Sequence, residues 1–328
     1  MLAARVRPCT TPRSNGSGPR SRTGKSVIVV SRLCIDIQYT CISFCTEAIV
    51  PLVTLSRAFW RSVPMGGKTG KKPDGTRTSD PRLTLQTVVR AMDVLEAIGA
   101  SGGALSLAEI ANAVGIDRSA AQRIAHTFEG LGYLERSDGG IGFRPGRRLL
   151  DRCFDYLRSD PLVERATPVL IELRKVVRER VDLSLFDGGS LVYAVRLQSK
   201  RESFYATLIG RRFPTWCTSG GRAMLAHLPD GEVDAILDQA EFRPYTQNTI
   251  TDRDHIWARI REARERGFAT SEGEVLMGEI AIGAAILGSN GRPVGAVHIA
   301  GSLSEWPRPE FETRFAPMAM ETAQTLSR

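Results

Sequence analysis

SLAEIANAVGIDRSAAQRIAHTFEGLGYLERSDGGIGFRPG, residues 106–146, is the stretch that decides the fold of the first part of this chain. Ser106 and Glu109 form a capping box, and apolar residues then recur at helical spacing as far as Val114. Gly115 can adopt a positive φ, which commonly ends a helix. The sequence therefore predicts a short helix that ends near Val114.

A second helix is predicted after a turn of about four residues. Asp117 or Ser119 can cap it, and its predicted apolar face consists of Ala120, Ile124, Phe128 and Leu131. Two helices joined by a short turn with a Gly form the DNA-binding helix-turn-helix, although capped helix pairs also occur in small domains of other function. The predicted polar face carries side chains that can reach phosphates or base edges, namely Arg118, Ser119, Gln122, Arg123 and His126.

A hairpin is predicted after the second helix. Two short strands flank the turn sequence SDGG at residues 137–140, and the hairpin carries Arg136 and Arg144. This pattern is typical of the wing of a winged helix-turn-helix. Residues 83–150 hold seven Lys/Arg and seven Asp/Glu, so the placement of the polar side chains, rather than net charge, favours DNA binding.

The composition is that of a soluble globular protein with room for two domains, at 328 residues, 42% hydrophobic and 24% charged. The net charge of +8 is unevenly spread, because residues 1–82 hold 14 Lys/Arg and 4 Asp/Glu, whereas residues 83–328 hold 30 and 32. Charged residues interrupt the apolar part of 1–82, so no run approaches the ~20 residues of a membrane span, and no signal-peptide pattern is present. We expect this segment to be a disordered extension, or translated upstream DNA with Met65 as the true start.

Cysteine and histidine usage argues against catalysis and metal binding. Only Cys153 and Cys217 lie in the body of the chain, which favours a reducing cytoplasm without disulfides. The four histidines lack metal-ligand spacing, so neither a metal nor a cofactor is predicted. A cysteine-dependent enzyme is an alternative, with Cys217 as nucleophile and His227 as base. Ten helical residues span about 15 Å, however, so we predict that the chain is not an enzyme.

The remainder of the chain predicts further helices and two hairpins. A helix at 85–98 has an apolar stripe of Val88, Val89, Met92, Leu95 and Ile98. An amphipathic helix at 147–158 is limited by Pro161. Hairpins turn at 187–189 and 290–291, and helices are predicted at 170–177, 220–228, 231–239, 253–266 and 309–326. Antiparallel strands with helices to one side make an α+β domain.

These elements divide the chain into four parts. The expected parts are an extension at 1–82, a winged helix-turn-helix domain at 83–146, a linker helix at 147–160 and an effector-binding domain at 161–328.

A ligand site is predicted where the helix after Thr218 begins. Backbone N–H groups of Ser219 to Gly221 at a helix N-terminus can bind a carboxylate. The alternative is that Gly220 and Gly221 only permit a tight turn and that Ser219 only caps the helix. His298 can add a switchable donor or can be a satisfied core histidine. Gly220→Val is expected to block ligand entry by bulk.

The chain from about Leu83 to Leu326 resembles the IclR family of bacterial transcriptional regulators. SLAEIANAVGI and GLGYLER are similar to that family's DNA-binding region, and TSGGRAMLA, NTITD and RGFA to its effector domain. The spacing of one further set of residues matches the family's characteristic C-terminal motif: Gly267, Ser271, Glu274, Ala281, Ile282, Gly283 and Ile286. The resemblance implies an α+β fold class, with an N-terminal winged helix-turn-helix and a C-terminal GAF-like effector-binding domain.

The resemblance also implies a pocket for a small, usually acidic metabolite, and homodimers or dimers of dimers formed through the DNA-binding domains. Carried over position by position, the effector-binding residues are Ser219, Gly220, Gly221, Ser271, Ala281, His298 and Ala300. Members that bind small keto acids tend to have Asp, Cys and two serines where this chain has Ser271, Ala281, His298 and Ala300. Keto-acid specificity is therefore not implied.

The sequence thus predicts a cytoplasmic regulator that binds double-stranded DNA at a near-palindromic operator and responds to a small organic acid. A constitutive DNA-binding or interaction protein without a ligand is the alternative. The sequence names neither the effector nor the operator, and it leaves repression or activation, and dimer or tetramer, open.

Overall fold

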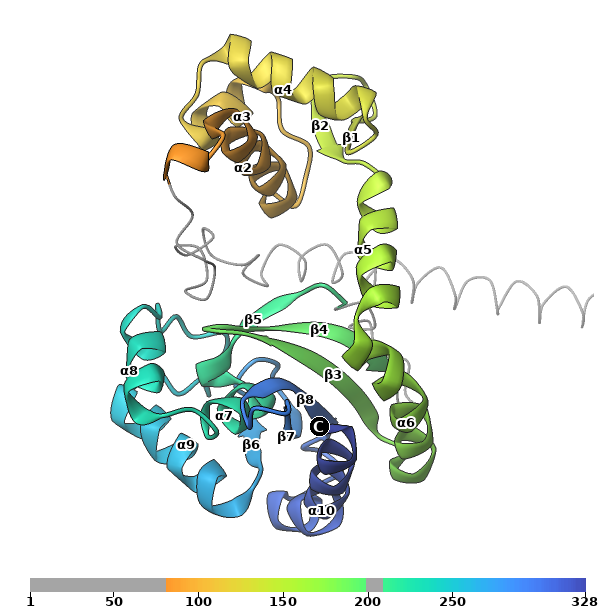
Figure 1. Ribbon diagram of the computed structural model, residues 1–328, viewed down its shortest axis with the longest axis vertical. Coiled ribbons are helices and arrows are strands. Elements are labelled where there is room, and N and C mark those ends of the chain that lie inside the picture. The colour runs from red at the N-terminus through yellow and green to blue at the C-terminus, as the bar shows by residue number, and fades with distance from the viewer. Residues whose placement is uncertain (1–80, 199–208) are drawn as a thin grey trace, which may run out of the picture. The chain divides into compact units, whose positions relative to one another are not determined.

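The computed structural model describes residues 81–198 and 209–328 (Figure 1). The expected extension at 1–82 lies outside these residues, apart from Pro81 and Arg82. The first domain consists of η1 (Pro81–Leu83), α2 (Gln86–Ala100), α3 (Leu107–Val114), α4 (Arg118–Gly130), β1 (Leu134–Arg136) and β2 (Phe143–Pro145). The predicted helix pair and wing are therefore both present.

Local hydrogen bonds place the helix pair where the sequence predicts it. Ser106 N donates to Glu109 Oε2 at 2.8 Å, and Glu109 N donates to Ser106 Oγ at 3.3 Å, which completes the capping box. Gly115 follows α3 with a φ of 73°. Asp117, and not Ser119, caps α4, because its Oδ1 accepts from Ala120 N at 2.8 Å.

The core of the first domain differs in detail from the predicted apolar faces. On α4 the fully buried residues are Ala121 and Ala125, whereas Leu131 is 46% exposed. Alanines allow the helices to approach closely, so the buried stripe is rotated from the one that bulky residues predict. On α2 the predicted Val88 and Met92 are exposed, and the core residues there are Val94 and Ile98.

One residue separates α5 (Arg148–Ser159) from α6 (Pro161–Val177). Asp160 ends α5, and its Oδ1 accepts from Leu162 N at 2.9 Å and from Val163 N at 3.0 Å at the start of α6. The predicted linker helix is thus α5, and it has no buried residue.

The second domain is built on one antiparallel sheet in the order β5-β4-β3-β8-β7-β6. Its strands are β3 (Arg180–Asp187), β4 (Ser190–Leu197), β5 (Arg212–Pro214), β6 (Ala269–Glu272), β7 (Glu279–Leu287) and β8 (Pro293–Ser302). Its other elements are η2 (Thr215–Cys217), α7 (Ser219–Leu225), α8 (Asp230–Asp238), α9 (Arg253–Arg266) and α10 (Arg308–Leu326). The α+β expectation is therefore confirmed.

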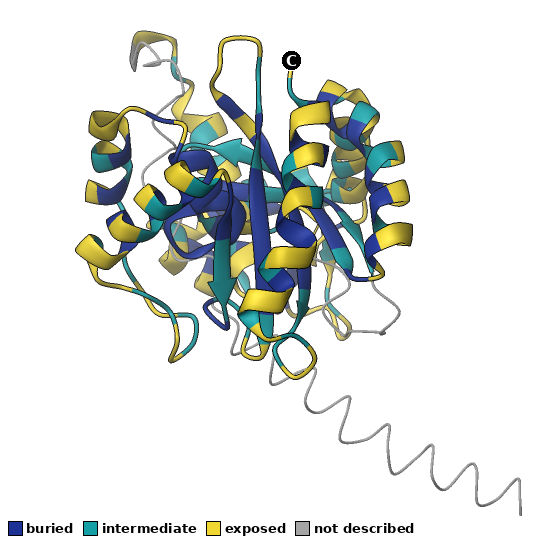
Figure 2. Cartoon of the chain, turned by 90° about the horizontal axis from the view of Figure 1, so that it is seen from below, coloured by how far each residue is buried: buried dark blue, intermediate teal, exposed yellow. Residues whose placement is uncertain are grey.

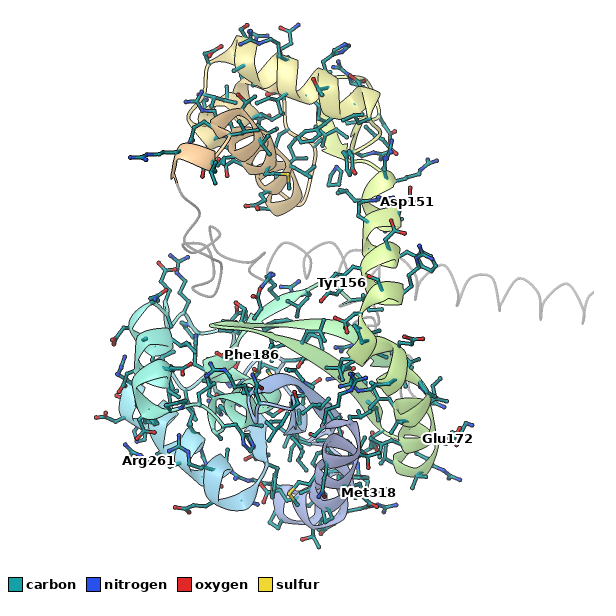
Figure 3. All side chains as sticks on the ribbon, viewed as in Figure 1. Asp151, Tyr156, Glu172, Phe186, Arg261 and Met318 are labelled. Carbon is teal, nitrogen blue, oxygen red and sulfur yellow. The ribbon has the colours of Figure 1, made fainter. Side chains whose placement is uncertain are left out.

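Helices cover both faces of this sheet, which corrects the expectation of helices to one side (Figure 2). On one face, Val181, Leu183 and Ile282 belong to a core that also contains residues of α6 and α10. On the other face, Gly283 lies directly against the backbone of α7. Small side chains on this face of the sheet allow α7 to pack closely on the strands. Small residues alone would not indicate that the face is buried. Exposed Glu172 of α6 and Arg261 of α9 point away from the domain (Figure 3).

Among residues 81–198 and 209–328, no helix combines the length and apolar character that crossing a bilayer requires.

Candidate nucleic-acid interface and ligand cavity

The polar face of α4 presents the predicted DNA-reading side chains to solvent. Five residues there are exposed: Arg118, Ser119, Gln122, Arg123 and His126. Within the described ranges, neither Arg118 nor Arg123 makes an ion pair. These two guanidinium groups are therefore available to an external partner.

The two wing arginines are engaged within the domain. Arg136 Nε lies 3.0 Å from Glu129 Oε1, and its guanidinium lies 4.2 Å from the ring centroid of Phe143. Arg144 Nη2 lies 3.6 Å from Glu135 Oε2. Exposed ion pairs of this kind contribute only about 0–1 kcal/mol. Arg136 and Arg144 can therefore exchange these partners for a phosphate at little cost.

A small cavity lies between α7 and the sheet of the second domain. Its enclosed volume is only about 40 Å³, and about 400 Å³ when the space open to solvent is included, so a ligand of several heavy atoms requires the lining side chains to move apart. We call it the inner cavity, and its lining residues are Arg180, Tyr193, Arg196, Phe213, Thr218, Ser219, Ser271, Val275, Leu276, Glu279 and Ala281. Of the predicted effector residues it brings together Ser219, Ser271 and Ala281. Gly220, Gly221, His298 and Ala300 are not among its lining residues.

The start of α7 packs closely against its surroundings, and one of the three amides of the predicted carboxylate site already has a partner. α7 has seven residues, and its cap is Thr218, whose Oγ1 accepts from Gly221 N at 3.2 Å. A Cβ at Gly220 would lie 2.2 Å from His298 Cε1, and one at Gly221 would lie 2.2 Å from Thr215 O. The glycines therefore serve close packing of α7. Gly220→Val would collide with the sheet, so it cannot test ligand entry alone.

His298 is a satisfied core histidine. Its Nε2 lies 2.7 Å from Ser184 Oγ, and its ring packs on Tyr193 with centroids 5.3 Å apart. Burial lowers the pKa of His298 to about 4. The imidazole is consequently neutral near pH 7 and is not the switchable donor that the sequence allowed. Ala300, also buried, pairs in register with Arg180 of β3 and Ala281 of β7.

Sequence reasoning missed a group of buried charges beside the inner cavity. Arg180 Nε lies 2.9 Å from Asp182 Oδ2, and Arg180 Nη1 lies 2.6 Å from Glu279 Oε2. Arg196 Nη1 lies 3.6 Å from Asp182 Oδ2. The signal in the sequence is the alternation of Arg180, Asp182 and Ser184 with apolar residues. Such alternation normally indicates a solvent face, but this face of the sheet is the one against which α7 packs.

A second buried ion pair joins α7 to the segment before β7. Arg222 Nη1 and Nη2 lie 2.6 and 2.7 Å from the two carboxylate oxygens of Glu274, and Arg222 Nε donates to Trp216 O at 2.8 Å. The guanidinium of Arg222 is 0% exposed. Neither residue lines the inner cavity, so this pair has a structural role.

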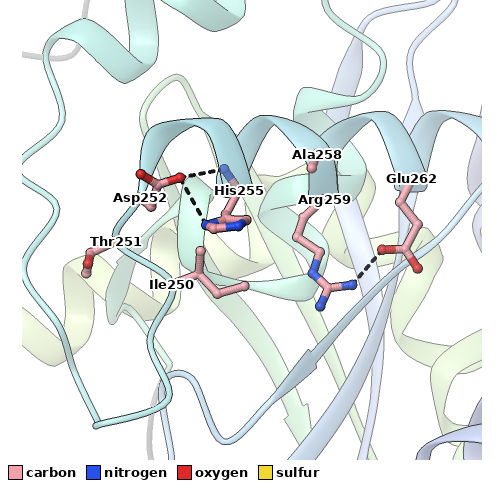
Figure 4. A pocket seen from close by; sticks show the side chains of 7 residues that line it. All are labelled: Ile250, Thr251, Asp252, His255, Ala258, Arg259 and Glu262. Atoms are coloured by element: carbon pink, nitrogen blue, oxygen red, sulfur yellow. Dashed lines mark hydrogen bonds and ion pairs between the residues drawn. The ribbon is translucent and has the colours of Figure 1, made fainter.

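A depression on the surface lies along the start of α9 (Figure 4). Its polar groups bind one another, because Asp252 Oδ1 lies 3.0 Å from His255 Nδ1 and Arg259 Nη1 lies 2.8 Å from Glu262 Oε2. None of the predicted site residues lines it. We therefore assign it no ligand.

The residues of the enzyme alternative are unsuited to nucleophilic catalysis. Cys217 is 0% exposed, and burial raises the pKa of its thiol. A thiolate is therefore disfavoured there. His227 is exposed at the surface. In the part of the chain that the structure describes, no three or more His, Cys, Asp or Glu residues are grouped to hold a metal ion.

Comparison with known proteins matches both domains. Residues 87–138 match the IclR helix-turn-helix domain, and residues 154–328 match the family described as bacterial transcriptional regulator IclR C-terminal. The Pca regulon regulatory protein of Pseudomonas putida is 26% identical over 250 residues, which cover 76% of this chain and 85% of that protein.

Solved structures agree with the fold. A transcriptional regulator from Rhodococcus sp. RHA1 is 30% identical, with a TM-score of 0.64 over 74% of this chain and 97% of that one. An IclR homologue from Microbacterium hydrocarbonoxydans, complexed with 4-hydroxybenzoate, shares the fold at 22% identity, with a TM-score of 0.59 over 74% of this chain and 97% of that one. The chain belongs to the IclR family of bacterial transcriptional regulators.

Proposed function

We propose that this regulator binds a near-palindromic operator as a homodimer, and that a small organic acid in the inner cavity changes its affinity for that operator. The observation that carries the DNA-binding half is the exposed polar face of α4 next to a wing, on which Arg118 and Arg123 make no ion pair with any described residue. Recognition helices of this type lie in the major groove, and two of them in a dimer read half-sites about 34 Å apart.

Arg123→Ala is expected to weaken operator binding without unfolding the domain, because Arg123 is exposed and opposite the core residue Ala125. If Arg123 reads a base, the loss is about 1–3 kcal/mol and specific to the operator. If it binds a phosphate, the loss is smaller and uniform, and the salt slope falls by about 1. Gel shift at several salt concentrations distinguishes the two.

The matched control is Arg152→Ala, which removes an exposed arginine of α5 that is paired with Asp155. This variant should bind the operator as the wild type does. Equal operator affinity of Arg123→Ala and wild type would remove Arg123 from the interface.

The organic-acid half of the proposal is supported by the two arginines that line the inner cavity, Arg180 and Arg196. Arginine is the side chain best suited to bind carboxylates. The related Microbacterium protein is complexed with 4-hydroxybenzoate, a phenolic acid. That compound is therefore our first probe for this chain.

The effector and the operator should change each other's affinity by the same factor, because coupling between two binding sites is reciprocal. We expect 4-hydroxybenzoate to raise the unfolding temperature of the free protein, and its calorimetric Kd to differ with and without operator DNA. A compound that stabilises the protein but binds equally in both conditions is not an effector. If no organic acid stabilises the protein, the constitutive alternative holds.

A further inference from the structure

The inner cavity contains a buried cation with almost no partner. The side chain of Arg196 is only 2% exposed, yet within the described ranges it makes no hydrogen bond. Its one ion contact is Nη1 to Asp182 Oδ2 at 3.6 Å, and its Nε reaches no acceptor. The ring of Tyr193 lies 5.7 Å from the guanidinium carbon.

A guanidinium group with so few partners is costly in this buried position. Arginine stays charged in proteins and has five N–H donors, and a buried charge normally requires both an opposite charge and hydrogen bonds. Arg180 differs, because it has close contacts to Asp182 and to Glu279. The positive charge that lacks hydrogen bonds in this group is therefore that of Arg196, and it lines a cavity.

Glu279 contributes a carboxylate to the lining of the same cavity. Its Oε2 accepts from Arg180 at 2.6 Å, whereas its Oε1 takes no hydrogen bond from the described residues. A carboxylate oxygen is an acceptor only, so it favours a donor and repels a second carboxylate. Asp182 Oδ1 also lacks a partner, but Asp182 does not line the cavity.

The lining residues other than Arg180, Arg196 and Glu279 are uncharged, and two of them are aromatic. Tyr193 and Phe213 pack edge to face with centroids 5.9 Å apart, and Val275 and Leu276 complete the apolar lining. A ligand that complements this lining therefore carries one anionic group, a separate neutral hydrogen-bond donor and an apolar part.

We propose that Arg196 binds the carboxylate of the effector and that Glu279 accepts a hydrogen bond from a hydroxyl or similar donor at its other end. This assignment rests on the proposed organic-acid regulation and adds the ligand class, a monocarboxylate with a separate donor. It also moves the anion contact from the amides at the start of α7 to a side chain of β4.

The test uses the full chain and four probes that share one ring: 4-hydroxybenzoate, benzoate, terephthalate and 4-hydroxybenzamide. A second series carries the same four combinations of end groups on a four-carbon chain: 4-hydroxybutanoate, butanoate, succinate and 4-hydroxybutanamide. Calorimetry should rank the hydroxy acid first. The acid without the donor should bind more weakly, and both the dicarboxylate and the uncharged amide should bind at least ~10-fold more weakly.

Three variants then separate the roles. Arg196→Gln should lower hydroxy-acid affinity by roughly 10- to 100-fold and abolish the preference for acid over amide. Glu279→Gln should instead reduce the discrimination against the dicarboxylate. Arg212→Gln removes an exposed arginine of β5 that is paired with Asp187, and it is the matched control. It should change neither the affinity for the hydroxy acid nor the discrimination between the probes. Unfolding temperatures show whether each variant is folded.

The outcomes distinguish this assignment from the function on which it rests. Acids that bind the wild type and folded Arg196→Gln equally well would overturn the role of Arg196 and leave organic-acid regulation standing. A wild type that prefers the dicarboxylate would overturn the role of Glu279. A wild type that binds no acid of either series would overturn both the assignment and the organic-acid effector.

Discussion

Glu274→Gln is expected to destabilise the second domain by about 3–5 kcal/mol, as is typical when one partner of a buried ion pair is removed. The substitution keeps the size of the side chain, so the loss arises from charge. Arg222 would remain fully buried with no opposite charge, although its Nε still donates to Trp216 O. Denaturant unfolding followed by tryptophan fluorescence measures the change, because Trp216 lies in the same domain.

Two further variants establish the cause. The double variant Arg222→Met with Glu274→Leu replaces both charges by apolar groups and should recover much of the lost stability. Glu241→Gln removes one partner of an ion pair whose side chains are 72% and 70% exposed, and it should change stability by less than about 0.5 kcal/mol. A Glu274→Gln protein within about 1 kcal/mol of the wild type would contradict a buried, uncompensated charge.

Gly283→Ala is expected to cost about 3 kcal/mol, because a single methyl group there has no space. Its Cβ would lie 2.3 Å from Gly220 N and 2.5 Å from Gly220 Cα. Both atoms belong to the backbone, so relief requires that α7 move away from β7. Since Ser219 at the start of α7 lines the inner cavity, we expect effector affinity to fall as well.

Gly231→Ala is the matched control. Gly231 lies in α8, and a Cβ there would meet nothing within 4 Å. Alanine is favoured over glycine in a helix by about 1 kcal/mol, so this variant should be neutral or slightly more stable. Comparison of the unfolding free energies of the two variants separates the effect of the contact with the Gly220 backbone from the effect of replacing a glycine. Equal stability of Gly283→Ala and wild type would show that α7 can shift without cost.

The first domain could be predicted closely because its signals are local. A capping box, a glycine with positive φ and a turn sequence each act within a few residues, and the structure has all three at the predicted positions. The face that α4 buries was less predictable. The close contact through Ala121 and Ala125 depends on the other helices, and alanine carries little periodic signal of its own.

The inner cavity could be predicted only in part because it depends on contacts between distant residues. Ser219, Ser271 and Ala281 were identified through their motifs. Arg196 and Glu279 are 83 positions apart in the sequence and meet only once the sheet has formed. A polar residue at alternate positions of a strand normally indicates solvent, and nothing local revealed that α7 covers this face.

Successive residues of β3 lie on opposite faces of the sheet, so neighbouring positions in the sequence have different roles. Val181 and Leu183 pack into the core beneath the sheet, whereas Arg180 and Asp182, one position away from each, belong to the charged group on the opposite face. A substitution at Val181 or Leu183 alters the packing of that core, whereas one at Arg180 alters the chemistry of the inner-cavity lining. Under the proposed function, the ligand of the inner cavity can therefore change in descendants of this chain while the scaffold stays the same.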